Sequence, residues 1–309
     1  MELVTLGAAA LELAPPGSER LETAQTLDVG VTGPECNAAA AAGRVGAEPV
    51  WLSRLPAGPL GARVEGELRG HGVEVVADTV VGRQGLTFFE RGRTPRPDAR
   101  IDDLGNAVVE GLTMDSIPTD RVEAADTAYV TAATPRASTG LAGATAKFLK
   151  TASDAGARTA LGVLDSRGWS DLDSARETLE GLLPAVDVLV GTADAVEAVF
   201  DRGGEPSKVT HALASSHDLE TVALCRTSDA AVWHDSTVHG FERPEVDSVD
   251  ATGAVDAFAG AFLAGLDGGV KAALRRGVAA DALVRTTPEA LPTFSSDEVE
   301  AVAETLDRT

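Results

Sequence analysis

The residues most able to do chemistry lie close together in the sequence, between Asp250 and Asp256. A turn of small residues, Ala251-Thr252-Gly253-Ala254, is followed by Asp256 and then by an apolar stretch typical of a buried helix. A helix N-terminus offers unpaired N–H groups and the positive end of the helix dipole, so a phosphate could bind at this turn. Asp256 would then act as a base, or it could simply cap the helix. The residues alone leave both interpretations open.

A second carboxylate, Asp250, precedes the turn. Two carboxylates would repel a phosphate unless Mg²⁺ and a substrate hydroxyl were also present, with Asp256 as the base. The chain contains neither a GxxxxGK[ST] motif nor a GxGxxG motif. If the protein transfers phosphate, we therefore expect neither a P-loop nor a dinucleotide-binding fingerprint to hold it.

The charge of the chain limits the kinds of partner. Its 309 residues carry a formal net charge of −22, which disfavours both nucleic acid and anionic lipid. Lysine occurs at only four positions. Abundant carboxylates with so few lysines resemble the composition of proteins from salt-loving organisms, and an ordinary acidic cytosolic protein is the alternative.

Neither cysteine usage nor hydrophobicity indicates an exported or membrane protein. Cys36 and Cys225 fit no metal-ligand or disulfide pattern. The N-terminus lacks the basic region of a signal peptide, and no apolar stretch approaches the ~20 residues that span a bilayer. We expect a cytoplasmic protein with no membrane partner.

The order of predicted elements indicates an α/β fold. The first predicted elements are a strand at 3–13, a helix at 36–46, a strand at 48–55 and a helix at 59–72. From residue 127 onward, helical stretches alternate with short apolar strands at 127–134, 158–165, 186–192 and 221–227. The last third is predicted to be mostly helical, at 253–266, 270–285 and 295–306. Strands alternating with helices of this length predict βαβ units and a parallel sheet.

One segment does not fit this alternation. Residues 82–111 combine strand-like pieces with several glycines and prolines. Together with parts of 14–35, they are predicted to leave the main sheet and form a small β-lid. No linker or internal repeat is visible, so residues 1–309 are predicted to form a single domain.

The segment "DATGAVDAFAGAFLAG", at 250–265, resembles the C-terminal signature D-[TA]-T-G-A-G-D-x-F of the ribokinase-like (PfkB) sugar kinases. The resemblance covers essentially the whole chain. Within the family, "PPGSERLETA", "GRQGLTFFERG" and "ALVRTTPEALP" are similar to segments of 2-keto-3-deoxygluconate kinases. The resemblance implies a doubly wound, mostly parallel sheet with flanking helices, and a β-lid that closes over a sugar.

The resemblance also implies the reaction and its residues. It implies ATP and Mg²⁺, leaves a requirement for K⁺ open, and suggests a homodimer formed through the lids. Asp256 would deprotonate a primary hydroxyl, and the transferred phosphoryl group would bind the amides of Gly253, Ala254 and Val255. The residues implied to bind the sugar are Gly33, Glu35, Asn37 and Arg167, and those implied to bind the nucleotide are Thr192, Thr227, Asp250 and Thr252. No residue is assigned to a metal.

Several positions depart from the family pattern. Val255 stands where the pattern has glycine, and valine would be strongly disfavoured there if the backbone needs a positive φ. The Tyr-x-Arg of the lid aligns with residues 101–103, so that Asp103 would repel an anionic substrate. The nucleotide-side K-x-G-x-x-G is replaced by "CRTSDA" at 225–230.

These departures leave three interpretations of the function. The chain could be a 2-keto-3-deoxygluconate kinase whose sequence has drifted, or a kinase for another sugar or a nucleoside. Alternatively, it could be a weak or inactive paralogue with a binding or regulatory role.

Overall fold

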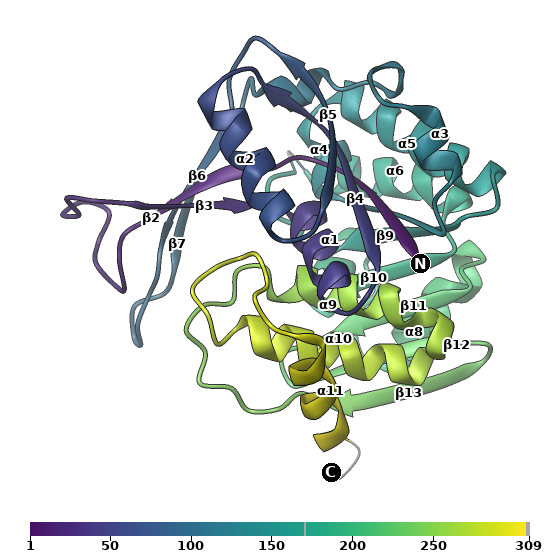
Figure 1. The fold of residues 1–309 in the computed structure, drawn as a ribbon. Helices are drawn as coiled ribbons and strands as arrows, with labels where there is room; N and C mark the ends of the chain where they lie inside the picture. The colour runs from purple at the N-terminus through teal and green to yellow at the C-terminus, as the bar shows by residue number, and fades with distance from the viewer. Residues whose placement is uncertain (170, 307–309) are drawn as a thin grey trace.

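A computed structural model describes residues 1–169 and 171–306 (Figure 1). Within this part of the chain, a central sheet of nine strands has the order β13-β12-β11-β10-β9-β8-β1-β4-β5. The neighbouring strands from β11 to β5 are parallel, whereas β12 runs antiparallel to both β11 and β13. In sheet order, the strands are β13 (Thr237–Glu242), β12 (Asp229–His234), β11 (Thr221–Cys225), β10 (Val188–Thr192), β9 (Arg158–Val163), β8 (Thr127–Thr131), β1 (Glu2–Leu6), β4 (Glu48–Pro56) and β5 (Glu74–Val80).

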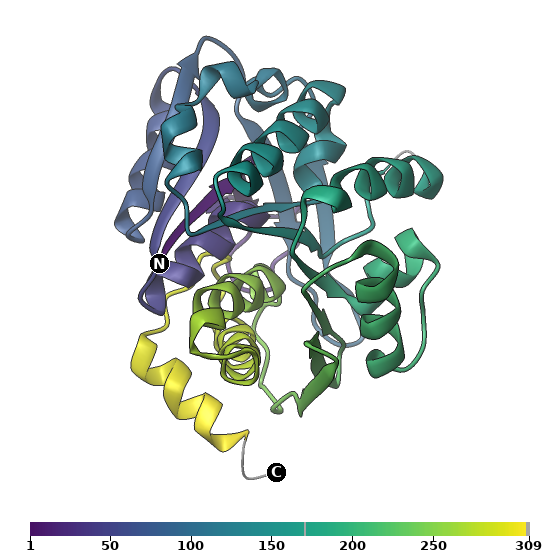
Figure 2. The same ribbon diagram turned by 90° about the vertical axis from the view of Figure 1, so that its right-hand side faces the viewer.

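Helices cover both faces of this sheet, as the two perpendicular views show (Figures 1 and 2). One group contains α1 (Pro34–Arg44), α2 (Pro59–Gly70), α9 (Ala254–Gly265), α10 (Val270–Val284) and α11 (Ser296–Thr305). The other contains α3 (Thr119–Glu123), α5 (Thr139–Asp154), α6 (Leu172–Leu182), α7 (Ala193–Phe200) and α8 (Pro206–His217). The short helix α4 (Ala133–Ala137) and four 3₁₀ turns, Val108–Gly111, Met114–Ser116, Leu183–Ala185 and Leu266–Gly268, complete the described elements. The doubly wound α/β class predicted from the sequence is confirmed.

Helices α1 and α9 approach each other closely because small residues line their contact. Residues 38–42, five consecutive alanines of α1, are fully buried. Gly260 of α9 lies so near the backbone of Ala38 that an added Cβ would collide with its carbonyl oxygen. This contact brings the first turns of the two helices, 220 residues apart in the chain at Pro34 and Ala254, to the same edge of the sheet.

A second sheet projects from the body of the molecule as the β-lid (Figure 1). Its order is β3 (Asp28–Thr32), β2 (Ala10–Ala14), β6 (Gly85–Glu90) and β7 (Ala99–Asp103). The register aligns Glu12 of β2 with Thr87 of β6, and Thr87 with Asp102 of β7. Since side chains alternate along a strand, these three lie in one row on one face of the lid.

The single strand predicted at 3–13 is wrong, because this segment forms two strands in different sheets. β1 belongs to the central sheet and β2 to the lid, and the chain bends between them at 7–9. Gly7 packs against the buried carboxyl group of Glu35, and a Cβ at Gly7 would collide with it. The bend therefore depends on a contact with α1 that the pattern of 3–13 does not reveal.

Three further strands, β7, β12 and β13, were not predicted individually. The strand β7 is fully exposed and lacks the apolar alternation that identifies a strand. The hairpin β12–β13 turns at Asp235 and Ser236, whose φ values are 45° and 61°. This pair of left-handed residues suits a tight hairpin turn, but the usual sequence for such a turn contains glycine. In the part of the chain that the structure describes, no helix is long and apolar enough to cross a bilayer.

Candidate active site

The first turn of α9 is built around Gly253. Gly253 has φ 77° and ψ −7°, a left-handed conformation, and a Cβ there would collide with the carbonyl oxygen of Ala290. Only glycine avoids both problems. The helix begins at Ala254, and no side chain caps its first N–H groups. The amide of Ala254 donates to the carbonyl of Ala251 at 3.2 Å. Among the described residues the amides of Gly253 and Val255 have no such partner, so they are open to an anion, as at other helix N-termini that bind phosphate.

Val255 lies within α9 and has no positive φ, so it does not need the conformational freedom of glycine. The left-handed residue of the turn is Gly253, two positions earlier. The amide of Val255 therefore keeps its helical direction, and the strain that the sequence raised as a question is absent at this residue.

Asp256 is bound by Asn37 rather than by its own helix. Nδ2 of Asn37 donates to Oδ2 of Asp256 at 2.8 Å. Within the described residues, Oδ1 of Asp256 accepts no hydrogen bond and so remains able to accept one from a ligand. This contact across two helices disfavours the interpretation that Asp256 is simply a capping residue.

Burial raises the pKa of Asp256 to about 6. The hydrogen bond from Asn37 and the charge of Arg100 act to lower this pKa, and the charge of Asp165 acts to raise it. A carboxyl group with this pKa is mostly ionised at pH 7 but more basic than an exposed aspartate. These are the properties expected of a general base that works near neutral pH.

Glu35 and Gly33 lie where α1 begins, but Glu35 does not reach the surface of the site. Its carboxyl group is fully buried and Oε1 accepts hydrogen bonds from the amide of Thr131, at 2.9 Å, and from the hydroxyls of Thr131 and Thr134, at 2.7 and 2.8 Å. Burial raises the pKa of Glu35. The structure therefore places this expected sugar contact inside the protein, where it ties α1 to the end of β8. Gly33 packs against the backbone of Ala8.

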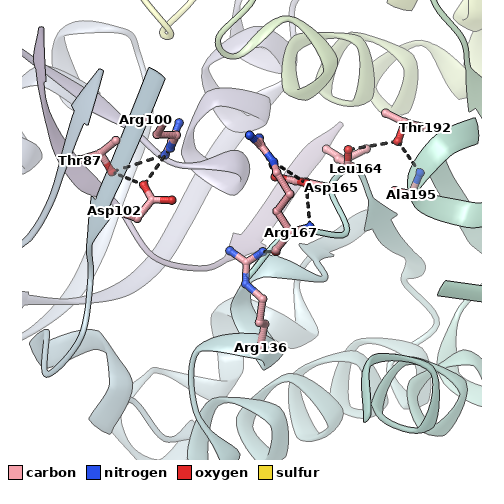
Figure 3. A network of polar contacts seen from close by, with 9 residues as sticks. All are labelled: Thr87, Arg100, Asp102, Arg136, Leu164, Asp165, Arg167, Thr192 and Ala195. Carbon is pink, nitrogen blue, oxygen red and sulfur yellow. Dashed lines mark hydrogen bonds and ion pairs between the residues drawn. The ribbon is translucent and has the colours of Figure 1, made fainter. Parts of the chain in front are cut away.

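The lid presents a cation to the site at Arg100. Nε of Arg100 donates to Asp102 at 2.8 Å, and Thr87 donates to the same oxygen of Asp102 at 3.0 Å (Figure 3). Arg100 lies close enough to Asp256 for its charge to affect the pKa of that carboxyl. Glu12, from the same row, is buried, and its Oε2 has no hydrogen-bond partner among the described residues.

The prediction that Asp103 opposes an anionic substrate is wrong. Asp103 points to the opposite face of the lid from Asp102 and Arg100, because neighbouring residues of a strand alternate. It forms an ion pair there with Arg83. The lid lacks an arginine at position 103, but Arg100 supplies a cation on the opposite face.

Arg167 lies on the other side of the site, after β9. Its Nε donates to both carboxylate oxygens of Asp165, at 3.0 and 2.9 Å, and 78% of its side chain is exposed. Arg136 of α4 donates to the backbone carbonyl of Arg167 and thereby supports this loop (Figure 3). Hydrogen bonds to Asp165 raise the pKa of Arg167, and the charge of Asp102 adds to the increase, so the loop faces the lid.

A cavity of about 360 Å³ lies next to the first turn of α9, on the side away from the lid. Two of the expected nucleotide residues, Thr192 and Thr227, line it, together with Val255. Thr192 also caps α7, since its hydroxyl accepts from the amide of Ala195 at 3.2 Å (Figure 3). Two of the expected nucleotide residues and one residue of the turn, Val255, therefore share one cavity.

The other two expected nucleotide residues do not line this cavity. Asp250 is buried, and its carboxylate binds Nε of Arg91 at 2.7 Å and the amide of Thr252 at 2.8 Å. Arg91 follows β6 and also donates to the carbonyl of Pro288. The carboxylate of Asp250 therefore stabilises the turn through the amide of Thr252, and its ion pair with Arg91 connects the turn to the lid.

A model of the pfkB family carbohydrate kinases matches residues 2–296. The chain belongs to the pfkB family of carbohydrate kinases. A curated relative, the 2-dehydro-3-deoxygalactonokinase of Haloferax volcanii, is 43% identical over 308 residues, covering 97% of this chain and 96% of that protein.

Two solved structures illustrate how the fold of this pfkB-family kinase compares with others. The 2-dehydro-3-deoxygluconokinase of Thermotoga maritima superposes with a TM-score of 0.93 at 25% identity, over 98% of this chain and 99% of that one. A putative ribokinase II of E. coli, in complex with ATP and Mg²⁺, superposes with a TM-score of 0.85 at 17% identity, over 98% of this chain and 99% of that one. The second comparison shows the fold alone.

The sequence did not single out two residues of this candidate site, Arg100 and Glu12. Treating 99–103 as a strand would have placed Arg100 and Asp102 on one face and Asp103 on the other. Glu12 was hidden inside a strand predicted to belong to the main sheet. No sequence signal links Arg91 to Asp250, because that contact depends on how the lid joins the body.

Proposed function

We propose that this kinase transfers the γ-phosphoryl group of ATP to a primary hydroxyl of a 2-keto-3-deoxy sugar acid. The observation that carries the proposal is the carboxylate of Asp256, oriented by Asn37 beside the turn at Gly253. Asp256 takes the proton of the hydroxyl as its oxygen forms a bond to the γ-phosphorus. The bond from that phosphorus to ADP breaks, and ADP leaves. The amides of Gly253, Ala254 and Val255 stabilise charge on the transferred group.

A sugar acid is favoured by the cations on the two sides of the site. Arg100 reaches in from the lid, and Arg167 stands on the facing loop after β9. Guanidinium groups bind carboxylates strongly and in a defined geometry. The two relatives named for 2-dehydro-3-deoxy sugar acids support the same choice. Asn37 and Gly33 complete the floor under the lid.

ATP and Mg²⁺ fit the residues beside α9. The cavity lined by Thr192 and Thr227 is large enough for part of a nucleotide. The similar structure of the putative ribokinase II of E. coli contains ATP and Mg²⁺. The described residues contain no cluster of three or more possible metal ligands. Mg²⁺ would therefore be held mainly by nucleotide phosphates. Two carboxylates line this cavity, Asp194 and Asp281, and Asp281 is already bound by Arg243 and Arg285. We assign no residue to K⁺, since the buried carboxylate of Asp250 is already neutralised by Arg91.

ADP release with ATP and Mg²⁺ tests the proposal directly. The substrates would be 2-keto-3-deoxygluconate, 2-keto-3-deoxygalactonate, ribose, fructose and adenosine, measured at low salt and in molar KCl. We expect turnover on the keto-acids that is lost in Asp256→Asn. Turnover only on an uncharged sugar or on adenosine would favour the alternative kinase, and a folded protein with no turnover at all would contradict the proposal.

The expectations on assembly, location and salt remain predictions. Strand β7 is an edge strand of the lid and its five residues are exposed, which supports a homodimer through the lids. The family supports the predicted cytoplasmic location. An origin in a salt-loving organism is supported by the acidic composition and by the Haloferax relative.

A further inference from the structure

A cluster of two partly buried arginines around one buried aspartate lies where α10 passes the end of β13. Arg285 donates to Asp281 from Nε, at 2.9 Å, and from Nη2, at 3.2 Å, and Arg243 donates to the same carboxylate from Nη2. The exposed fractions of the side chains are 12% for Arg243, 23% for Arg285 and 2% for Asp281. Two guanidinium groups therefore share one carboxylate in a setting largely removed from water.

This cluster carries one more positive charge than its neighbours balance. Buried charges normally have partners of opposite sign, because losing hydration without one costs several kcal/mol. The pair formed by Arg91 and Asp250 obeys this rule with one cation and one anion. Burial lowers the pKa of Arg243, and the charge of Arg285 lowers it further. In a chain with a net charge of −22, an unbalanced and partly buried cation indicates a place for an anionic ligand.

The surplus charge faces the cavity next to α9. Arg243, Arg285 and Asp281 all line the cavity of about 360 Å³. Nη1 of Arg285 and Nε of Arg243 make no hydrogen bond within the described residues, so each guanidinium still has donors to offer. Arg243 also donates from Nη1 to the carbonyl of Arg226 at 2.9 Å, which fixes its direction.

The other charged residues of the cavity do not cancel the surplus. Arg226 is matched by Asp229, which it contacts through Nε at 2.7 Å. Asp194 is exposed to solvent, and no ion pair within the described residues joins it to Arg243 or Arg285. The unpaired charge therefore belongs to Arg243 and Arg285.

We propose that Arg243 and Arg285 bind a phosphate group of the donor nucleotide. This inference rests on the proposed function, and it names side chains that would supply affinity where the glycine-rich segment of the family is replaced by residues 225–230. A guanidinium presents several N–H donors in a plane and matches phosphate oxygens well. Arg285 also binds the turn region through its backbone, since its carbonyl accepts from the amide of Val249 at 2.8 Å.

Equilibrium binding of ATP, ADP, AMP, adenosine and pyrophosphate tests this proposal. We expect Arg243→Met and Arg285→Met each to weaken ATP and ADP about 10- to 100-fold, the loss typical of one charge-assisted hydrogen bond, and to leave adenosine unchanged. Arg276→Met is the matched control, because Arg276 also lies on α10 but pairs one-to-one with Glu300. Each variant still leaves Asp281 with one arginine, so the buried carboxylate stays paired.

The Lys variants of the same two residues keep the charge and guard against a misfolded Met variant. Arg243→Lys and Arg285→Lys should recover part of the ATP affinity. Unchanged ATP affinity in both Met variants would overturn the proposal, and so would an equal loss of adenosine and ATP. Pyrophosphate bound as tightly as ADP would identify a site for a free anion instead, which also overturns it. None of these binding results depends on turnover, whereas the proposed function fails if no sugar supports ADP release.

Discussion

Asn37 and Asp256 are 219 positions apart in the chain, yet the amide of one donates to the carboxylate of the other at 2.8 Å. This contact fixes the orientation of the carboxylate and leaves Oδ1 of Asp256 without a hydrogen-bond partner in the described part of the chain. The pair therefore presents one basic oxygen toward the space under the lid. Loss of this contact should lower the turnover rate more than the stability of the fold.

Asp256→Asn should abolish the base while keeping a side chain of the same size. We expect the turnover rate to fall by about 10²- to 10⁴-fold, the usual contribution of general acid–base catalysis. Steady-state ADP release measures this loss. Nucleotide affinity and the circular dichroism spectrum should stay close to those of the unchanged protein, and a variant that keeps the original rate would show that another group is the base.

The same substitution should not lower stability at neutral pH. Since the pKa of Asp256 is about 6 in the folded protein, above its ordinary value of 3.8, ionisation of this group disfavours the folded state increasingly as the pH rises from about 4 to 6, and fully above 6. This penalty decreases as the pH falls from 6 and is absent below about 4. Thermal melting of Asp256→Asn should therefore match or exceed that of the original chain at pH 7, with no such advantage at pH 4.

The rate should depend on pH through the same group. Protonation of Asp256 removes the base, so kcat/KM should fall as the pH decreases through about 6. Asn37→Ala removes a hydrogen bond that lowers this pKa, and the acid limb should move to higher pH. A pH–rate profile of both proteins measures the shift, and an identical acid limb would contradict the role of Asn37 in orienting and tuning the base.

The turn at Gly253 should tolerate no side chain. Gly253→Ala combines a φ of 77° with a collision at Ala290, and we expect a loss of about 1–3 kcal/mol in the free energy of unfolding. Denaturant titration measures it. Val255→Gly is the matched comparison, because Val255 is already helical and glycine there should cost only about 1 kcal/mol without raising activity. Higher activity in Val255→Gly would mean that the valine obstructs the phosphate.

The two site arginines should distinguish acids from neutral sugars. Arg100→Met and Arg167→Met should each raise KM for a keto-acid by roughly tenfold or more, the value of a charge-assisted hydrogen bond, and change kcat less. Arg83→Met is the control, since Arg83 pairs with Asp103 on the other face of the lid. Equal effects of all three substitutions would indicate damage to the lid rather than loss of a carboxylate contact.

High salt should stabilise the protein. A net charge of −22 makes the folded chain repel itself, and salt screens this repulsion. We expect the melting temperature to rise steadily between about 0.1 and about 2 M KCl. A melting temperature independent of salt would contradict the comparison with salt-adapted proteins.

The sequence was sufficient for the fold class and for the turn that holds Asp256, because both depend on local patterns. The alternation after residue 127 and the signature at 250–265 each reflect one supersecondary unit. Strand registers and lid contacts depend on distant segments instead. The bend at Gly7 requires the carboxyl group of Glu35, and the face on which Arg100 lies requires knowing that 99–103 is a strand.

The same limit explains the expected roles that the geometry changed. Glu35 seemed to be a sugar contact because of its place in the N-terminal motif, yet its three hydrogen bonds come from the region around Thr131, which no pattern links to it. Asp250 was expected to bind the nucleotide, yet its carboxylate forms an ion pair with Arg91, which follows lid strand β6. Both carboxylates are buried, and the partners of a buried charge are decided by tertiary packing.

The alanine-rich contact between α1 and α9 has a consequence for how the protein is made. During synthesis, α1 emerges about two hundred residues before its partner, a separation set by the positions of Ala38 and Gly260. Until then, the side of α1 that faces α9, which includes Ala38, has nothing to pack against, and Asn37 does not have Asp256 to bind. Catalytic activity can therefore appear only after the C-terminal third has docked, so the return of turnover on refolding reports the completion of the whole chain.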